Sequence, residues 1–315
     1  MTHYPIEIQP PDIACYRSGN AGVDYVHVFD SGRAGPIVMV QALTHGNEFC
    51  GALALDTLMR EGIRPAAGRL ILAFANVEAF ARFDLDDPDA SRYIDEDYNR
   101  VWADDALFGP RDSVELRRAR ELRPFVDAAD FLLDIHSMHE PCRPIMVCGM
   151  INKHVALARK VGLPADLLVD TGHPAGLRMR DRGSFNDPES RRSSLLIECG
   201  QHWERAAPAV ALDCTLRFLA HFGLLSRDET RARLGDVRPA EQRAIAVTHV
   251  VTIASETFSF AMPVRGLMVV PKAGTLLATD DGRDVRTPHD DCVLIMPTRR
   301  PKVGETAVRL GRFVD

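Results

Sequence analysis

Histidine and glutamate side chains stand at the ends of three apolar runs, where they could share one metal ion. His45 and Glu48 follow one such run, His136 closes a second, and Glu198 closes a third. The carboxyl ends of parallel strands meet at one edge of a sheet, so these residues would converge although they are far apart in the sequence. Catalytic zinc takes three protein ligands and leaves one position for water. His45, Glu48 and His136 are therefore the candidate ligands.

The His45–Glu48 pair also has an interpretation without a metal. Asn47 or Glu48 could cap the helix that follows, with His45 merely packed beside it. Residues three apart on the first turn of a helix can equally place an imidazole nitrogen and a carboxylate on one ion. The histidine and glutamate at the other strand ends favour the metal.

Two neighbours of His136 bear on the ligand set. His139 forms a His-x-x-His pair with His136 and is a rival third ligand, although it lies beyond the end of the predicted strand. Asp134 lies two residues before His136, hence on the same face of that strand. It would orient His136 as a hydrogen-bond partner, unless it is simply a carboxylate at the buried edge.

The segment 91–102 (SRYIDEDYNRVW) is the other dense polar stretch. Neighbouring asparagine and arginine side chains can clamp one carboxylate through several donors, which suits Asn99 and Arg100. Arg92 could polarise a scissile carbonyl and stabilise the oxyanion. The alternative is a loop of ion pairs with the acids at 95–97.

Apolar runs of strand length alternate with helical patterns along the first three quarters of the chain. Near-continuous apolar strands separated by helices predict an α/β fold, with a mostly parallel sheet covered on both faces. Strands are expected over 35–43, 68–76, 131–137, 143–150 and 193–200, and helices over 48–62, 113–130, 152–164 and 204–223.

The pattern changes after about residue 240, where short strand-like runs are separated by Gly, Pro and Asp turns. This predicts a small all-β module. The polar stretch 226–243 is the expected connector. We therefore predict a catalytic domain over 1–235 and a β-rich C-terminal domain over 244–315.

Composition restricts the partners. The formal net charge of −6 argues against a nucleic-acid binder, which usually carries a basic face. No run approaches the roughly 20 apolar residues that span a membrane, and the N-terminus lacks a secretory pattern. Seven scattered cysteines suit reduced thiols better than a disulfide framework. These features predict a cytoplasmic protein.

In combination, these motifs resemble the succinylglutamate desuccinylase/aspartoacylase family, a branch of the zinc carboxypeptidase-like superfamily. The resemblance rests on HGNE, RYIDEDYNR, DIH and IECG, which begin at residues 45, 92, 134 and 197 and occur in the family's order. It covers roughly residues 35–225. It implies a zinc carboxypeptidase-like catalytic domain, and a C-terminal module that narrows access to the site and favours small substrates over peptides.

The resemblance also implies residue roles. His45, Glu48 and His136 would bind one zinc ion per subunit, and Glu198 would be the catalytic base and proton shuttle. Arg92 would help to bind the oxyanion, and Asn99 with Arg100 would hold the α-carboxylate of an N-acyl amino acid. Zinc lowers the pKa of its bound water from 15.7 to about 7 and polarises a carbonyl.

Two features concern the substrate. Family members that recognise a dicarboxylic substrate need a further basic residue, for which this sequence offers Arg178, Arg180 and Arg182. The family also tends to supply a tyrosine from the C-terminal module. Here the nearest candidate is His289.

The resulting prediction is a zinc-dependent deacylase of small N-acyl amino acids or related N-acyl amines. A metallocarboxypeptidase acting on short peptides would use the same metal and carboxylate clamp. A protein that only binds a metal or metabolite is the third interpretation, and the glutamate at 198 argues against it, since pure binding needs no base. The sequence leaves the oligomeric state open, a homo-oligomer included.

Overall fold

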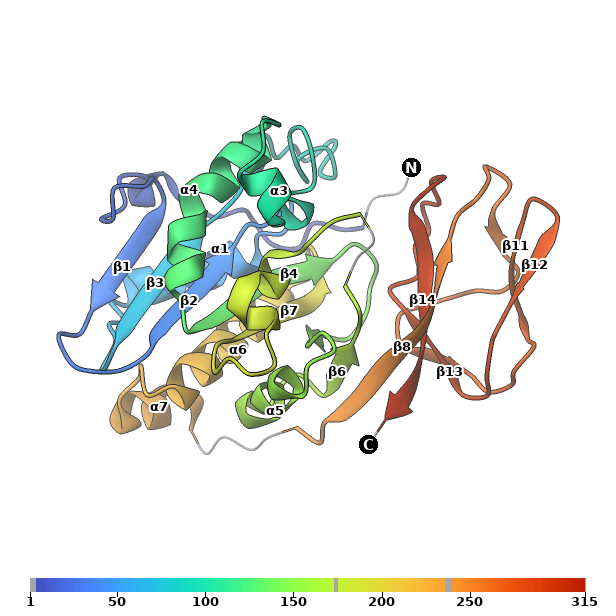
Figure 1. Ribbon diagram of the computed structural model, residues 1–315. Helices are drawn as coiled ribbons and strands as arrows, with labels where there is room; N and C mark the ends of the chain where they lie inside the picture. Colours follow the sequence, from blue (N-terminus) through green and yellow to red (C-terminus); the bar gives the residue numbers. More distant parts are fainter. Residues whose placement is uncertain (1–3, 173–174, 236–239, 315) are drawn as a thin grey trace.

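A computed structural model describes residues 4–172, 175–235 and 240–314. Its main feature is a large mixed sheet with helices on both faces (Figure 1). The C-terminal segment of the chain adds further strands at one edge of this sheet. The sheet has the order β1-β3-β2-β4-β7-β5-β6-β8-β14-β13-β10. Its strands are β1 (Val26–Asp30), β2 (Ile37–Ala42), β3 (Arg69–Phe74), β4 (Phe131–Met138), β5 (Ile145–Val147), β6 (Asp166–Val169), β7 (Ser193–Gln201), β8 (Arg243–Thr252), β10 (Met268–Val270), β13 (Cys292–Ile295) and β14 (Thr306–Val314).

The centre of this sheet is parallel, as the alternating pattern predicts. β3, β2, β4 and β7 run parallel to one another, and β5, β6 and β8 form a second parallel group. β5 runs antiparallel to β7, and the edge strands β1, β14, β13 and β10 are also antiparallel to their neighbours. The fold is therefore a mixed α/β fold with extra antiparallel strands.

Helices cover the two faces of the sheet because successive strand residues point to opposite sides. On one face Leu133 and Ile135 of β4 pack under α1 (Cys50–Arg60), α5 (Asn152–Val161) and α6 (Ala207–His221). On the other face Leu132 packs under α4 (Val114–Ala128). The shorter helices are α2 (Val77–Phe80), α3 (Asp104–Leu107), α7 (Arg227–Leu234), and the 3₁₀ turns η1 (Ala14–Tyr16), η2 (Tyr98–Arg100), η3 (Met179–Asp181) and η4 (Gly183–Asn186).

The strands that sequence analysis missed are short or polar. β6 has four residues, and β1 (VHVFD) and β12 (Arg283–Arg286) lie at sheet edges and carry charged side chains. Such segments give little hydrophobic periodicity. The expected connector at 226–243 contains α7, which begins with a capping box between Ser226 and Glu229. Residues 236–239 of that connector lie outside the described part of the chain.

The C-terminal strands continue the main sheet. β8 runs parallel to β6, and β14 pairs with β8 in an antiparallel ladder. A second sheet has the order β12-β11-β9, with β11 (Leu276–Asp280) and β9 (Ser259–Phe260). The sheet hydrogen bonds therefore cross the boundary that we predict between the two domains, and the division itself stays a prediction.

The cysteines of the chain are all free thiols, and five of the seven are buried. This agrees with the expectation of reduced thiols. Among the described residues, no helix has the length and apolar character needed to cross a bilayer.

His154 of α5 is a buried histidine outside the predicted site. Its Nε2 lies 3.0 Å from the Phe185 carbonyl oxygen, which can only accept, so Nε2–H donates and Nδ1 accepts from the Ser193 hydroxyl at 2.8 Å. Burial, with help from Arg180, lowers its pKa to about 3. The histidine is therefore neutral in the folded state.

We expect this histidine to make the protein sensitive to acid. As the pH falls below about 6.5, the unfolded chain binds a proton at this residue and the folded chain does not, so stability is lost. The loss amounts to about 2 kcal/mol at pH 5. Denaturant unfolding of wild type and His154→Gln at pH 7 and pH 5 measures it, since glutamine can donate and accept in the same way but does not titrate. An unchanged pH dependence in the variant would contradict the assignment.

Candidate metal centre and active site

The turn that carries His45 and Glu48 is tightly fixed. It follows β2 through Leu43, whose φ of 59° lies in the left-handed region and turns the chain away from the strand direction. A Cβ atom at Gly46 would lie only 2.3 Å from the Ser91 carbonyl oxygen, so only glycine fits there. The Gly46 N–H donates to the Arg92 carbonyl oxygen at 3.1 Å. The turn and the loop at 91–92 are therefore locked together.

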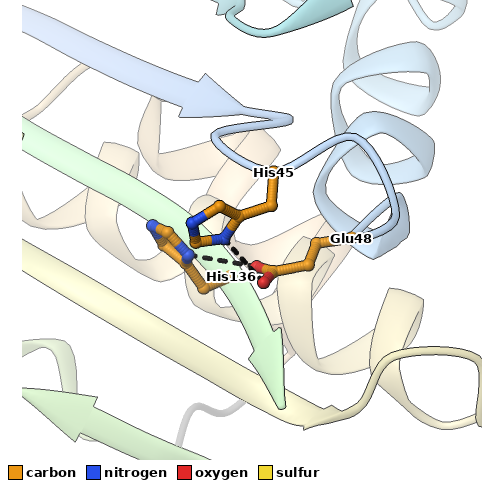
Figure 2. A group of neighbouring side chains, drawn as sticks. All are labelled: His45, Glu48 and His136. Atoms are coloured by element: carbon orange, nitrogen blue, oxygen red, sulfur yellow. Dashed lines mark hydrogen bonds and ion pairs between the residues drawn. The ribbon is translucent and has the colours of Figure 1, made fainter. Parts of the chain in front are cut away.

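His45, Glu48 and His136 form one buried cluster (Figure 2). Each offers a ligand atom, and these atoms lie within 4.8 Å of one another. Nδ1 of His45 is 2.7 Å from Glu48 Oε1, and Nδ1 of His136 is 3.0 Å from Glu48 Oε2. The side chains are at most 4% exposed. Two imidazoles and a carboxylate are a donor set that zinc binds.

The opposite nitrogens of both imidazoles are held by carboxylates. His136 Nε2 lies 2.9 Å from Asp134 Oδ2, and His45 Nε2 lies 3.0 Å from Asp97 Oδ1. Thr44 donates to the other oxygen of Asp134 at 2.8 Å. For His136, the carboxylate at Nε2 fixes the tautomer that presents Nδ1 to a metal. Asp134 thus has the orienting contact that its position on the strand predicts.

The charges of the cluster are strongly coupled. Burial favours the neutral form of His136, but the carboxylates of Asp134 and Glu48 outweigh it and hold the pKa of His136 well above its usual value. Burial likewise raises the pKa of Glu48, but His45 and His136 outweigh it and hold that pKa well below its usual range. A positive charge is therefore favoured between these carboxylates, and a metal cation would supply it in place of the proton.

Glu198 lies directly beside His136. The two are register partners on the parallel strands β7 and β4 and point to the same face of the sheet. Oε2 of Glu198 is buried and has no hydrogen-bond partner among the described residues. Burial raises the pKa of Glu198 to about 8, with His136 acting against it and Glu48 adding to it. A carboxyl group with an unused oxygen is thus aimed at the space beside the cluster.

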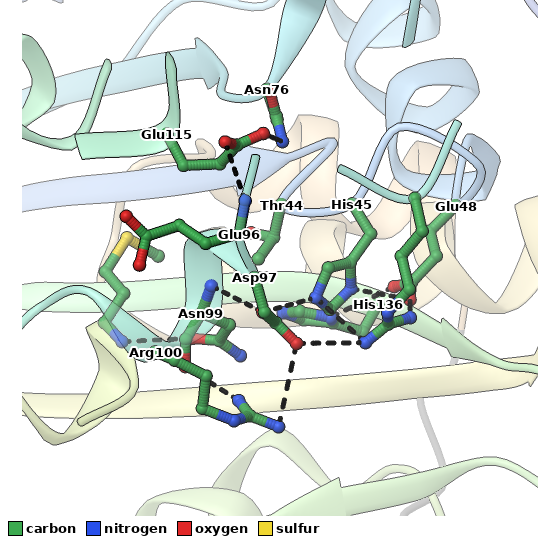
Figure 3. A network of polar contacts seen from close by, with 12 residues as sticks. Thr44, His45, Glu48, Asn76, Glu96, Asp97, Asn99, Arg100, Glu115 and His136 are labelled. Atoms are coloured by element: carbon green, nitrogen blue, oxygen red, sulfur yellow. Dashed lines mark hydrogen bonds and ion pairs between the residues drawn. The ribbon is translucent and has the colours of Figure 1, made fainter. Parts of the chain in front are cut away.

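The loop 91–100 brings Arg92 into contact with the cluster and carries Asn99 and Arg100, which are labelled in Figure 3, nearby. Arg92 donates to Glu48 Oε1 at 3.1 Å and contacts His45 Nε2 at 3.0 Å. Arg100 lies 3.9 Å from Asp97, and the side-chain oxygen of Asn99 accepts from the Met179 N–H at 3.1 Å. Of the acids at 95–97, Asp97 forms ion pairs with Arg92 and Arg100 in this loop and also contacts His45. Glu96 pairs instead with Arg111, outside the loop.

The arginines at 178–182 are held by the protein's own acids. Arg178 donates two hydrogen bonds of 2.9 Å each to the carboxylate of Asp170. Burial opposes the charged form of Arg178, but Asp170 and Asp181 outweigh it and raise the pKa of the guanidinium. Arg180 donates to the Cys148 carbonyl at 2.9 Å and is 1% exposed. Arg182 is paired with Asp104 and Asp127. Their roles as substrate contacts stay predictions, for which these side chains would have to change partners.

The two other histidines that the sequence offers as site candidates, His139 and His289, lie outside the cluster. His139 pairs with Asp89 and Glu140 and does not belong to the metal-type group. His289 Nε2 lies 3.0 Å from the Thr248 hydroxyl. Among the described residues, His289 has no hydrogen bond or ion pair to the cluster, and its role in substrate binding stays a prediction.

Arg309 of β14 is a residue that sequence analysis did not single out. It pairs in register with Ile295, so both point to the same face of the sheet. Ile295 packs with Met138 and Leu196, which share their face with His136 and Glu198. In the part of the chain that is described, Arg309 has no ion pair or hydrogen bond. Only the register of the last strand reveals this cation, because nothing in the local sequence TAVRLG marks it.

These features define a mixed α/β protein with a candidate metal centre at the carboxyl edge of its parallel strands. The profile of the succinylglutamate desuccinylase/aspartoacylase catalytic domain matches residues 34–222. The chain therefore belongs to the succinylglutamate desuccinylase/aspartoacylase family. No curated protein matches the chain significantly.

Solved structures share the fold over most of the chain. Succinylglutamate desuccinylase from Vibrio cholerae has a TM-score of 0.69 at 16% identity, over 92% of this chain and 86% of that one. The product-bound ectoine utilization protein EutE from Ruegeria pomeroyi has a TM-score of 0.63 at 20% identity, over 91% and 88%. A succinylglutamate desuccinylase/aspartoacylase from Rhodobacter sphaeroides has a TM-score of 0.64 at 19% identity, over 92% and 89%. The shared fold therefore extends beyond the residues that the family profile matches.

Proposed function

We propose that this protein is a zinc-dependent hydrolase that cleaves the amide bond of a small N-acyl amino acid or related N-acyl amine. The observation that carries the proposal is Glu198, whose unpaired carboxyl oxygen lies beside the His45–Glu48–His136 cluster. A site that only stores a metal has no need of such a group. When bound, zinc supplies a Lewis acid that polarises the amide carbonyl and acidifies water.

The side chains divide the remaining work. Glu198 takes the proton of the attacking water at its free oxygen and later gives it to the leaving amine. Arg92 donates to the carbonyl oxygen as negative charge develops there. Its present contacts with Glu48 and Asp97 hold the guanidinium at the edge of the cluster. The products are a carboxylic acid and a free amine.

Substrate binding is assigned to the loop beside the cluster. Asn99 and Arg100 hold the carboxylate of the amino acid, which is the reason to expect N-acyl amino acids. Arg100 is only weakly neutralised by Asp97 at 3.9 Å, and burial with the nearby Arg178 and Arg309 lowers its pKa. A bound anion would offset the repulsion between the guanidinium of Arg100 and those of Arg178 and Arg309. We further propose that the catalytic domain is of the zinc-carboxypeptidase type and that the β-rich domain narrows access to it.

Removal of the Arg100 guanidinium should weaken substrate binding. We expect Arg100→Ala to raise KM about 10- to 100-fold, the value of one or two hydrogen bonds to a charged group. Steady-state kinetics on an N-acyl amino acid and on its carboxamide measure the effect. The carboxamide should be insensitive to the change, and so should the control Arg111→Ala, an exposed arginine paired with Glu96. An unchanged KM would remove the carboxylate role.

The function is tested by hydrolysis of a panel of N-acetyl, N-succinyl and N-malonyl amino acids, beside di- and tripeptides. Metal content is measured on the same zinc-loaded and chelator-treated samples. Chelator-sensitive cleavage of an N-acyl amino acid, with the peptides inert, is the expected result. Cleavage of peptides would indicate a metallocarboxypeptidase, and bound zinc without any turnover would indicate a binding protein.

A further inference from the structure

Glu115 is a fully buried carboxylate that takes no part in the proposed chemistry. It is the second residue of α4, and its exposed fraction is 0%. Oε1 accepts from the Ile94 N–H at 2.7 Å and from the Asn76 side-chain amide at 3.0 Å. Oε2 accepts from the N–H groups of Asp95 at 3.1 Å and Glu96 at 3.3 Å. Among the described residues it has no ion pair, and these four donors satisfy both of its oxygens.

These donors belong to the middle of the loop that carries the active-site side chains. Arg92 lies two residues before Ile94 in the sequence. Asp97 directly follows Glu96, and both are labelled in Figure 3. A return contact strengthens the attachment, because Asp95 Oδ2 accepts from the Val114 N–H at 2.8 Å. The loop is therefore fixed to the N-terminus of α4, and α4 in turn packs on the sheet.

The same network reaches the metal-type cluster from its other side. Asn76 donates through its backbone N–H to the Leu43 carbonyl at 2.8 Å, just before the turn that carries His45. Asp97 lies 3.0 Å from His45 Nε2, and Arg92 lies 3.1 Å from Glu48 Oε1. One carboxylate thus ties together the two segments whose side chains meet at the cluster.

We propose that Glu115 is a positioning residue, whose buried carboxylate holds the backbone at 94–96 and thereby places Arg92 and Asp97 at the metal centre. Its catalytic consequence rests on the proposed function. Glutamine cannot replace it, because the amide nitrogen must face one pair of donors. Asn76 could turn its side-chain oxygen toward that nitrogen, since this oxygen is buried and unpaired, but a backbone N–H would still be opposed.

The first test does not depend on turnover. Amide hydrogen exchange of Ile94, Asp95 and Glu96 is measured by NMR on metal-free wild type, Glu115→Gln and Glu121→Gln. We expect exchange to be at least 10-fold faster in Glu115→Gln and unchanged in Glu121→Gln. Glu121 is a matched control, since it lies on the same helix with a side chain that is 55% exposed. Equal exchange in all three proteins would overturn the proposal even if the enzyme proves to hydrolyse amides.

The second test uses the N-acyl amino acid that wild type cleaves. Glu115→Gln should lower kcat at least 10-fold with zinc content unchanged, and should have less than a 3-fold further effect in an Arg92→Lys background. A merely structural role would lower activity in proportion to the folded or zinc-loaded fraction, and its effect would multiply with that of Arg92→Lys. If Glu115→Gln does not fold, both measurements are made on Asp95→Ala, which removes the exposed contact between the loop and α4. Faster amide exchange and a lower kcat are again expected. If the effects of Asp95→Ala and Arg92→Lys on kcat simply multiply, the proposal is refuted.

Discussion

Glu198→Gln is expected to lower kcat by about 10²- to 10⁴-fold, the usual value of a general acid–base group. The amide has the same shape but cannot take a proton from water. Zinc content should remain at about one per chain, because the ligands are His45, Glu48 and His136. Measurement of kcat, KM and zinc stoichiometry on the same preparations checks both expectations, with the exposed Glu189→Gln as control.

The same substitution has a second expected result in the metal-free protein. Burial raises the pKa of Glu198 to about 8, so the carboxyl group is protonated and neutral near pH 7. Glutamine then replaces one neutral group with another, and the thermal stability of the metal-free protein should hardly change. A bound cation favours the carboxylate and restores the base. Retained turnover in Glu198→Gln would refute the role of the base, whatever the effect on stability.

His136→Ala is expected to abolish zinc binding. Its Nδ1 faces Glu48 at 3.0 Å inside a cluster that is nearly closed to solvent, and among the described residues only His45 and Glu48 share this group with it. Zinc stoichiometry should fall from about one to near zero, and the activity with it. Metal analysis after dialysis against limiting zinc gives the result.

The metal-free variant should also be less stable than metal-free wild type. Removal of the imidazole leaves the buried Asp134 without its ion-pair partner, whereas Glu48 keeps His45 and Arg92. Breaking a buried ion pair in this way costs about 3–5 kcal/mol. His139→Ala is the matched control, because it removes a histidine three residues away that pairs with Asp89 and Glu140 at the edge of the site. Zinc kept by His136→Ala and lost by His139→Ala would reverse the ligand assignment.

Much of the sheet and of the cluster could be predicted because the signals are local. Each parallel strand is a nearly unbroken apolar run, and each polar candidate closes or follows one. Since parallel strands end at one edge, the convergence of His45, Glu48 and His136 needs no knowledge of distances. The same logic places Asp134 and Glu198, because alternation along β4 and β7 sends them to the face that carries His136.

The substrate side of the site was less predictable. Arg178, Arg180 and Arg182 offer the right chemistry, but each is paired with acids of the protein. The sequence contains no pattern that predicts which acid pairs with which arginine, and some of these acids lie far from the arginines along the chain. Arg309 enters the site face from the last strand of the sheet, and Glu115 reaches its four donors across a loop.

The sequence by itself determined which residue types meet at the strand ends, and hence the kind of chemistry the site can support. The direction in which a side chain points depends on the secondary structure of the few residues around it, and the local sequence pattern predicts that secondary structure. Only the tertiary structure decided which charges are neutralised and which remain available to a ligand. The strength of a charge interaction depends on separation and burial in space, and neither quantity can be read from the order of residues along the chain.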